Sequence, residues 1–434
     1  MGKMNFHTVM SAIRFSWIVV ILMLTVACSS DTVKGDIDYL AGDMLTTEVD
    51  GQTFYFLNNF DGTVSISYDR RNPMHTSASN KYVLTDYVGE ITVPSAITVD
   101  GVTYQVTGVT DCAFMYNTTL TKVVLPATVT KIGEMAFDGC TLLEEVNIPE
   151  GVTAIPDYCF YGCKALRVVT MPSRLNSIGK YAFKSCTKLE SMTIPEGVTT
   201  IESEIFRGCS YMTSLTLPST LTTIGSKAFY GCNQLTTLTI PDGVSVLPDS
   251  CLYGCNRLTE LTLPKNLTTV GVHCFRGCSA LTRLELPASL RHISKLAFYG
   301  CSKLVSIEIP EGITALPDSA FASCGALLEV ILPETLTSLG VGTFATCRSL
   351  FEITLPASVQ SIGEKCFYSN DATTGNANWN NLVVNVKSPT PPAVTGSFVN
   401  QVKRRRAVVP RGSRKTYMET AYWSEFFEVM ETNY

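Results

Sequence analysis

The sequence predicts an elongated solenoid of short parallel strands, and two observations carry this prediction. A proline recurs every 23 residues through the central part of the 434-residue chain, without a slip. The series consists of Pro126, Pro149, Pro172, Pro195, Pro218, Pro241, Pro264, Pro287, Pro310, Pro333 and Pro356. Positions at a fixed distance from each proline, numbered here as slots with proline as slot 0, repeat the same kind of residue. A short fixed period of this kind is typical of stacked repeats that contact only their neighbours.

The apolar slots of each repeat predict one strand and one buried column of side chains. Slots 3, 6, 17, 20 and 22 are apolar, and slot 11 is phenylalanine except where Leu252 replaces it. In the stretch LTI at residues 238–240, apolar slots 20 and 22 flank polar slot 21, which is the period of a strand. Proline at slot 0 has no N–H for a sheet and suits the end of that strand. We therefore expect one short strand per repeat, paired with neighbours about 5 Å away.

These residues resemble a known family at nearly every slot. The repeat PSTLTTIGSKAFYGCNQLTTLTI at 218–240 and the stretch LTTLTIPDGVSVLPDSCLYGCNRL at 235–258 are similar to the LxxLxLPxxLxxIgxxAFxxCxxL pattern of BspA-like bacterial leucine-rich repeats. The resemblance covers roughly residues 38–434. It implies an α/β fold, a right-handed leucine-rich-repeat solenoid with a parallel β-sheet, an N-terminal β cap and a C-terminal cap. It implies less about function, because one fold hosts many activities.

Residues 1–27 are predicted to be a lipoprotein signal peptide. Lys3 and Arg14 precede an apolar run from Trp17 to Ala27, which is too short for a comfortable membrane span. The run ends in LTVAC at residues 24–28, which looks like a lipobox, so we expect a lipid on Cys28. A plain cleaved signal and an uncleaved anchor are the alternatives. Residues 28–37 are polar and predict a tether. The expected location is the outer membrane, with the fold at the cell surface; a periplasmic orientation stays open.

The two ends of the repeat region depart from its period. Residues 38–102 alternate like strands between turn signals such as Val99-Asp100-Gly101, and predict an N-terminal β-hairpin cap. A cap is needed because an open solenoid end exposes a sheet edge and an apolar core. Residues 103–378 are expected to form about 12 coils, and residues 379–434 a C-terminal cap with an aromatic helix near Tyr417 and Trp423. The basic run KRRR at 403–406 could attract anionic glycans or lipid, or be a solvated loop.

The chain has sixteen cysteines, but their placement argues against disulfide bonds. Ten of them occupy slot 14, where stacked side chains are parallel and do not converge as a bridge requires. Slot 10 alternates between cysteine and alanine, which indicates a small buried residue. The alternative is a four-thiolate metal site formed by Cys251, Cys255, Cys274 and Cys278. The same spacing without a second pair at residues 159 and 163 disfavours it, so we expect free buried thiols and no metal or other cofactor.

Composition and motifs disfavour catalysis and nucleic-acid binding. After loss of the signal peptide the histidines are His75, His273 and His292, and the sequence contains neither HExxH nor a phosphate-binding glycine loop. No nucleophile, base and orienting residue recur in a local motif. The formal net charge is −5, and it becomes more negative when Lys3 and Arg14 are removed. We therefore predict a protein that is not an enzyme and has no nucleic-acid partner.

Two outward rows of the repeat are candidates for ligand binding. Slot 21 carries a row of threonines, which strand propensity alone explains. Slot 12 is more suggestive, because tyrosine and arginine are enriched where proteins bind. Its candidate ligand-binding residues are Tyr161, Lys184, Arg207, Tyr230, Tyr253, Arg276 and Tyr299. The alternative is that these long side chains only cover the neighbouring turns.

The resemblance implies adhesion by a non-enzymatic surface protein. Its expected partners are host matrix proteins, host cells or other bacteria, and its mechanism is contact through a rigid extended face. A second hypothesis is a glycan-binding lipoprotein of a nutrient importer, favoured by exposed aromatic side chains at slot 12 or near Trp379. A third is a structural envelope protein without a specific partner. The ligand and the oligomeric state do not follow from the sequence.

Overall fold

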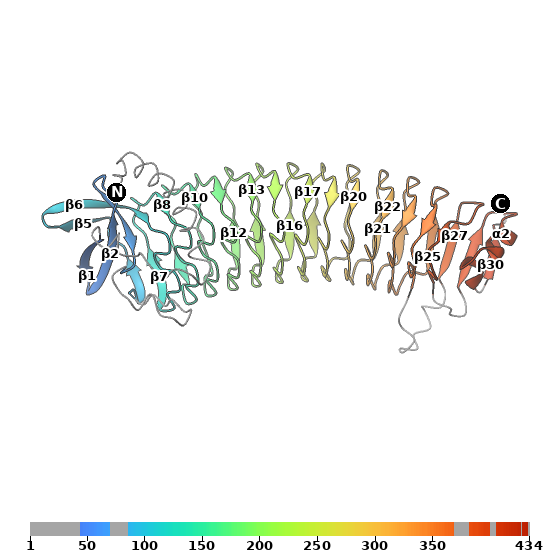
Figure 1. Ribbon diagram of the computed structural model, residues 1–434, viewed down its shortest axis with the longest axis horizontal. Helices are drawn as coiled ribbons and strands as arrows, with labels where there is room; N and C mark the ends of the chain where they lie inside the picture. Colours follow the sequence, from blue (N-terminus) through green and yellow to red (C-terminus); the bar gives the residue numbers. More distant parts are fainter. Residues whose placement is uncertain (1–43, 70–85, 369–381, 400–404, 427, 433–434) are drawn as a thin grey trace, which may run out of the picture.

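The computed structural model describes residues 44–69, 86–368, 382–399, 405–426 and 428–432. In these parts the chain forms a long rod of stacked coils, with a small sheet at the N-terminal end and short helices at the C-terminal end (Figure 1). No helix in the described ranges is long and apolar enough to cross a bilayer. The predicted signal peptide, Cys28 and the tether lie outside the described residues.

One row of parallel strands along the rod is formed by slots 19 to 21, as the alternation of apolar residues predicts. Its members in the repeats are β9 (Glu145–Val146), β12 (Ser191–Thr193), β14 (Ser214–Thr216), β16 (Thr237–Thr239), β18 (Glu260–Thr262), β21 (Ser306–Glu308), β23 (Glu329–Ile331) and β25 (Glu352–Leu355). Paired residues differ by 23 in number, as in Ser191 with Ser214. The slot-0 proline follows the strand, as at Pro241 after β16, so its missing N–H costs no sheet hydrogen bond.

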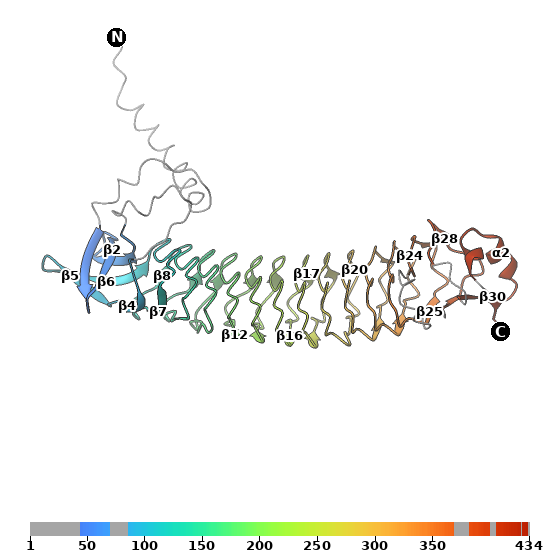
Figure 2. The same cartoon turned by 90° about the horizontal axis from the view of Figure 1, so that it is seen from below.

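A second row of strands lies at slots 5 and 6, so the expectation of one strand per repeat is wrong. Its members are β8 (Lys131–Ile132), β10 (Ala154–Ile155), β11 (Ser177–Ile178), β13 (Thr200–Ile201), β15 (Thr223–Ile224), β17 (Val246–Leu247), β19 (Thr269–Val270), β20 (His292–Ile293), β22 (Ala315–Leu316), β24 (Ser338–Leu339) and β26 (Ser361–Ile362). Two residues are too few to show an alternating pattern in sequence. Figure 2 shows the two rows on different sides of the rod.

Slots 8 to 14 form successive turns that close each coil. Backbone φ is positive at slot 9 and slot 13, as at Lys227 (58°) and Gly231 (72°). The turns also pair with the next coil, since the Phe229 N–H donates to the Cys251 carbonyl at 3.0 Å. Residues with positive φ interrupt a right-handed helix. For this reason the described coils contain no helix, and the helical part of the expected α/β class is absent from them. Within the described residues, helix is found after the coils, at α2 (Arg414–Glu419) and at the 3-10 helix η4 (Trp423–Glu425).

The slot-11 phenylalanines form the predicted column inside the rod. Their rings stack from coil to coil with centroids 4.8 to 6.2 Å apart from Phe114 to Phe229 and from Phe275 to Phe367. Leu252 separates these two blocks and is itself fully buried. Burying a phenylalanine contributes about 2–3 kcal/mol, so this column is a large part of the core.

The slot-14 cysteines are free and buried, as predicted. Each of the ten also donates its S–H to the carbonyl of the slot-11 residue in the preceding coil, at 2.9 to 3.3 Å. Burial raises the pKa of Cys232 well above its ordinary value and that of Cys255 to about 12, so these groups stay protonated and keep their donor. Cysteine therefore combines the size of a small apolar residue with a weak hydrogen-bond donor that fastens one coil to the next.

Carboxylates at slot 8 join some pairs of neighbouring coils in a second way. Oδ1 of Asp157 accepts a hydrogen bond from the Lys180 N–H at 2.7 Å. The same coil-to-coil bond joins Oδ1 of Asp249 to the Val272 N–H at 2.7 Å. Slot 7 of the receiving coil is glycine, because a Cβ on Gly179 would lie 2.5 Å from the Asp157 nitrogen. A Pro-Asp coil is therefore followed by a glycine coil.

At the N-terminal end a sheet joins the first coil. Its strands are β1 (Met44–Val49), β2 (Gln52–Asn58), β3 (Thr63–Ser67), β5 (Ala96–Val99) and β6 (Val102–Val109), in the order β1-β2-β3-β6-β5. Asp100 and Gly101 have positive φ and form the predicted tight turn between β5 and β6. However, β3 and β6 are parallel, so the sheet is more than a set of hairpins. Strand β6 also pairs with β8, while β4 (Gly89–Thr92) pairs in parallel with β7 (Leu120–Val124), and β7 pairs in parallel with β9.

At the C-terminal end the first row continues through β27 (Val383–Val386), β29 (Arg406–Val409) and β30 (Glu428–Glu431), and the second row ends at β28 (Ala393–Val394). Helix α2 (Arg414–Glu419) and the 3-10 helix η4 (Trp423–Glu425) pack beside them. The fully buried Trp423 ring lies 5.0 Å from Phe398 and 4.9 Å from Tyr417, and its N–H donates to the Pro392 carbonyl. Aromatic side chains therefore cover the end of the phenylalanine column. Tyr417 comes from α2 and Trp423 from the 3-10 helix η4.

One carboxyl group, that of Asp138, is buried without full hydrogen bonding. Asp138 occupies slot 12 of the coil that begins at Pro126, is 6% exposed, and has an Oδ1 atom without a hydrogen-bond partner. Burial raises its pKa to about 7, because water no longer stabilises the charged form. A carboxyl whose pKa is raised by folding destabilises the fold as pH increases from its unfolded pKa through its folded pKa.

We predict that Cys232→Ala destabilises the chain by about 1–2 kcal/mol, because it removes both a buried sulfur and its hydrogen bond to the Phe206 carbonyl. The matched control is Cys251→Ala at slot 10, where other coils already carry alanine, as at Ala228 and Ala297. Urea unfolding compares the two variants. An equal loss in both would show that the thiol hydrogen bond adds nothing measurable.

We predict that Asp138→Asn stabilises the chain by about 1–3 kcal/mol at pH 8 and by much less at pH 5. The wild-type carboxyl must ionise in a buried site at the higher pH, whereas an asparagine carries no charge at either. Urea unfolding of both proteins at the two pH values measures the difference. A stability gap that does not change with pH would contradict the buried-carboxyl explanation.

Candidate functional site

The predicted slot-12 residues form one line along the rod, and the structure adds a second line from slot 9. All seven predicted residues are half-buried. Slot 9 contributes Tyr158, Tyr181, Glu204, Lys227, Ser250, His273 and Leu296. The two lines touch within a coil, since the rings of Tyr158 and Tyr161 lie 5.8 Å apart. We call the seven slot-12 and seven slot-9 residues the tyrosine–cation ladder.

Rings and cations of the ladder lie over one another. The rings of Tyr230 and Tyr253 stack with centroids 4.5 Å apart and an interplanar angle of 6°. Arg207 lies over the other side of Tyr230 at 4.9 Å, and Arg276 lies over Tyr253 at 5.6 Å and over Tyr299 at 4.7 Å. Such cation–π contacts contribute about 0.5–1 kcal/mol each when exposed. The slot-12 side chains therefore do cover their neighbours, which is the role that the sequence analysis gave as the alternative to ligand binding.

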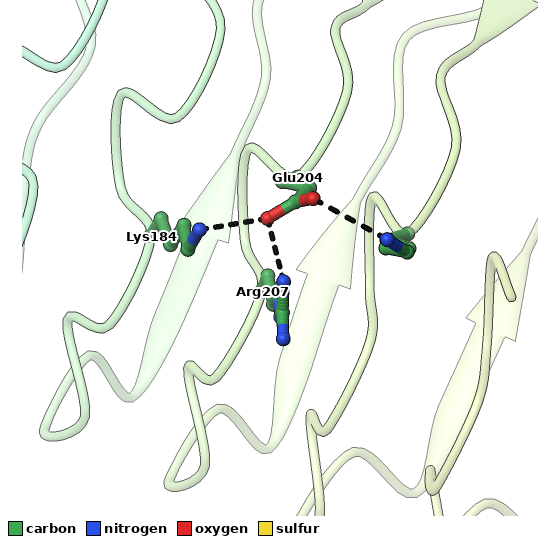
Figure 3. A network of polar contacts seen from close by, with 4 residues as sticks. Lys184, Glu204 and Arg207 are labelled. Carbon is green, nitrogen blue, oxygen red and sulfur yellow. Dashed lines mark hydrogen bonds and ion pairs between the residues drawn. The ribbon is translucent and has the colours of Figure 1, made fainter.

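One carboxylate collects three cations of the ladder. Glu204 accepts hydrogen bonds from Lys184 and Arg207, both at 2.8 Å, and its second oxygen lies 3.7 Å from the Lys227 ammonium (Figure 3). Partial burial would raise the pKa of Glu204, but the hydrogen bonds from Lys184 and Arg207 outweigh it and lower the pKa. The carboxylate is therefore ionised at neutral pH, and a surplus of positive charge surrounds it.

Tyrosine hydroxyls and an imidazole are further polar groups of the ladder. The hydroxyls of Tyr161, Tyr230, Tyr253 and Tyr299 have no hydrogen-bond partner among the described residues, so they can donate to a ligand. Burial, then the nearby Arg276, lowers the pKa of His273, so this imidazole is neutral at pH 7. Within the described ranges, no group of three or more His, Cys, Asp or Glu side chains is placed to hold a metal ion.

The slot-21 row on the first row of strands is exposed and polar over most of its length. Thr193 and Thr216 are paired neighbours on β12 and β14, and their side chains face solvent. Slot 18 on the same face also carries threonines, whose hydroxyls bond the preceding coil, as Thr236 does to the Thr213 carbonyl at 3.4 Å. In this part of the face, the slot-18 hydroxyls therefore have hydrogen-bond partners within the protein.

Near the C-terminal end the same face changes character, which the sequence reasoning missed. Slots 18 and 21 there carry exposed apolar side chains: Val305 (39%), Leu328 (45%), Ile331 (49%) and Phe351 (54%). The last three line a hollow of about 660 Å³ between β23 and β25. The signal was present, because threonine at these slots in other coils is replaced by apolar residues here. We call Val305, Leu328, Ile331 and Phe351 the apolar row.

Carboxylates border the apolar row. Glu329, Glu334 and Glu352 line the same hollow, together with Lys387. Lys387 pairs with Glu334, and Glu352 accepts a hydrogen bond from the Asn385 amide at 2.7 Å. The hollow therefore combines an apolar floor with a surplus of negative charge.

The basic run near the C-terminus is not a simple solvated cluster. Arg405 is 3% exposed, and its NH1 reaches the Phe367 carbonyl at 3.4 Å. Burial lowers its pKa to about 10. Arg406 lies 3.9 Å from Glu428 across neighbouring strands. Residues 403 and 404 of the run, and the aromatic candidate Trp379, lie outside the described residues.

Comparison with solved structures finds bacterial leucine-rich-repeat proteins. A leucine-rich repeat protein from Bacteroides ovatus is 25% identical, with a TM-score of 0.67, covering 93% of this chain and 100% of that chain. A leucine rich cell surface protein from Faecalibacterium prausnitzii is 23% identical with a TM-score of 0.52, covering 90% and 95%. A pneumococcal vaccine antigen is 17% identical with a TM-score of 0.50, covering 90% and 99%. No curated protein matches the sequence significantly.

The family comparison agrees with the 23-residue period. The family model for the BspA type leucine rich repeat region matches in overlapping segments at residues 107–236, 178–281, 199–327 and 245–374. Together these segments span more than half of the chain and contain the phenylalanine column and the slot-14 thiols. The chain therefore belongs to the BspA-type leucine-rich-repeat family.

Proposed function

We propose that this chain is a non-enzymatic surface protein that binds another protein through the apolar row and its acidic border. Family membership supports a protein-binding role, and the observation that carries the proposal is the apolar row itself. Contiguous exposed apolar side chains rimmed by polar residues mark interaction sites. They are retained here although the same slots carry threonine in other coils.

The partner's chemistry follows from the hollow. Its apolar floor favours a partner segment with aliphatic or aromatic side chains, which gains about 25 cal/mol for each Å² of apolar surface buried. Glu329 and Glu352 favour lysine or arginine beside those side chains, because complementary charges speed and orient association. The biological role that fits is adhesion to host matrix proteins, host cells or other bacteria.

The competing roles receive less support from the ladder. Glycan capture for a nutrient importer needs exposed aromatic faces, but Tyr230 and Tyr253 are covered on both sides by neighbouring rings and cations. A purely structural envelope protein requires no exposed apolar row. Trp379 remains the candidate aromatic side chain for the glycan-binding hypothesis.

Anchoring and end protection complete the proposal. A lipid on Cys28 and a tether at residues 28–37 would hold the rod on the outer membrane, facing outward. The sheet β1-β2-β3-β6-β5 and the aromatic group around Trp423 would act as caps of a right-handed solenoid. Each lies where an uncovered end would expose the phenylalanine column.

The direct test is binding of the chain from Ser29 onward to immobilised matrix proteins and to a panel of neutral glycans. Saturable binding to a matrix protein supports adhesion. Binding to neutral glycans alone would favour nutrient capture, and no binding to either would favour the structural role.

We predict that the triple variant Leu328→Thr, Ile331→Thr, Phe351→Thr binds the matrix protein about tenfold or more weakly. Each lost apolar contact costs about 1 kcal/mol or more. Threonine occupies these slots in other coils, so the fold is expected to persist, and urea unfolding checks this. Surface plasmon resonance measures affinity.

The matched control is Thr213→Ser, Thr216→Ser, Thr239→Ser on the same face, which should bind like the wild type. Full affinity in a folded triple threonine variant would exclude the apolar row as the contact.

We predict that Tyr230→Phe, Tyr253→Phe, Tyr299→Phe leaves stability unchanged, because phenylalanine keeps the stacking and removes only hydroxyls without partners among the described residues. If the ladder is part of the ligand surface, affinity for the matrix protein falls about threefold or more, since each lost hydrogen bond costs about 1 kcal/mol.

The companion variant replaces Tyr230, Tyr253, Arg276 and Tyr299 with alanine and should lose stability as well, because the stack is gone. Unchanged affinity in both variants, with the fold intact, would remove the ladder from the ligand surface.

A further inference from the structure

Positive charge is concentrated on one edge of an otherwise acidic chain. The net charge is −5, yet slots 12 to 17 contain no aspartate or glutamate between residues 161 and 350. The same slots carry exposed lysine and arginine at slots 15 and 16: Lys164, Lys188, Arg257 and Lys303. We call these four residues the cationic edge.

The stacking of the coils places the cationic edge in a line. Equivalent slots in successive coils lie about 5 Å apart, so the six steps between the seven coils from Lys164 to Lys303 span about 30 Å. No carboxylate of the described residues forms an ion pair with any of the four. Lys188 lies over the Tyr211 ring at 5.4 Å, which holds its ammonium on the edge. The turns between them are fixed by coil-to-coil bonds, such as the Ser279 hydroxyl to the Asn256 carbonyl at 3.3 Å.

The ladder adds further positive charge at slot 12 of three coils, three or four residues before slots 15 and 16. Lys184, Arg207 and Arg276 belong to it, and Glu204 is its one carboxylate. Because three cations surround Glu204, its charge is more than compensated (Figure 3). Edge and ladder together therefore present a positive strip with tyrosine hydroxyls beside it.

We infer that the cationic edge binds a linear anionic polysaccharide that carries sulfate or carboxylate groups. A single exposed lysine binds one anion weakly, whereas a polymer that contacts several cations releases its counterions together. Arginine matches sulfate and carboxylate oxygens with paired donors, and tyrosine hydroxyls can donate to sugar oxygens. This site is separate from the proposed protein contact at slots 18 and 21 and does not depend on it.

The ladder favours a polysaccharide over a single-stranded nucleic acid. Proteins that bind single strands stack bases on open aromatic faces. Here both faces of Tyr230 and Tyr253 are occupied, by each other and by Arg207 and Arg276. The aromatic groups can therefore contact a ligand by edges and hydroxyls, which suits sugars better than bases.

The test measures binding of the purified chain from Ser29 onward to heparin, hyaluronan and dextran at two salt concentrations, with single-stranded DNA as a polyanion control. Heparin distinguishes sulfate, hyaluronan carries only carboxylate, and dextran is neutral. We expect one or both anionic polysaccharides to bind, with affinity falling as salt increases, and dextran not to bind. DNA binding as tight as polysaccharide binding, or no polysaccharide binding, would overturn the inference.

The variant Lys164→Gln, Lys188→Gln, Arg257→Gln, Lys303→Gln should bind about tenfold or more weakly and with a shallower salt dependence. The control Lys131→Gln, Arg174→Gln, Lys180→Gln, Lys295→Gln makes the same change in net charge at exposed positions outside slots 12 to 17, and should stay within about twofold of the wild type. Equal loss in both sets would show an effect of net charge alone and contradict a site. Both sets should keep the matrix-protein affinity, so the two proposals fail separately.

Discussion

Every coil of this rod depends on the coil beside it, because a 23-residue unit cannot bury its own apolar side. The bonds that hold the structure therefore join equivalent slots of neighbours: strand to strand, thiol to the preceding slot-11 carbonyl, and slot-8 carboxylate to the next backbone N–H. All of them require the same spacing in each coil. The interior is consequently fixed, while slots 9, 12, 15, 16, 18 and 21 face outward and can vary. Binding surfaces arise where these outward slots depart from their usual residues.

Much of the fold follows from period and slot chemistry. The strands at slots 19 to 21, the phenylalanine column and the unpaired thiols were all predictable, because each is a local consequence of a pattern that recurs from coil to coil. The strands at slots 5 and 6 were not, since two residues carry no alternation and their pairing is set by the stack. The parallel pairing of β3 with β6 was also beyond sequence reasoning, because it joins segments across a long connection.

The candidate site was predictable in part. Slot 12 stood out by residue type, but its partners at slot 9 differ from coil to coil, and only the left-handed backbone there brings Glu204 toward Arg207. The apolar row was not predicted, because slots 18 and 21 were judged by threonine, their most common residue, and not by the coils that depart from it. In a repeat protein the exceptions, such as Leu328 and Phe351, are where outward surfaces differ.

Leu252 has a mechanical consequence for the rod. It interrupts the internal ring stack, so the interface on either side lacks the aromatic contact found elsewhere, and the strength of a repeat array is limited by its weakest interface. The next residue, Tyr253, stacks outside the core on Tyr230 and under Arg276, and so bridges the same three coils. The outer ladder thus reinforces the rod at the point where its centre is weakest, and a ligand that loosened it would make the molecule easier to bend there.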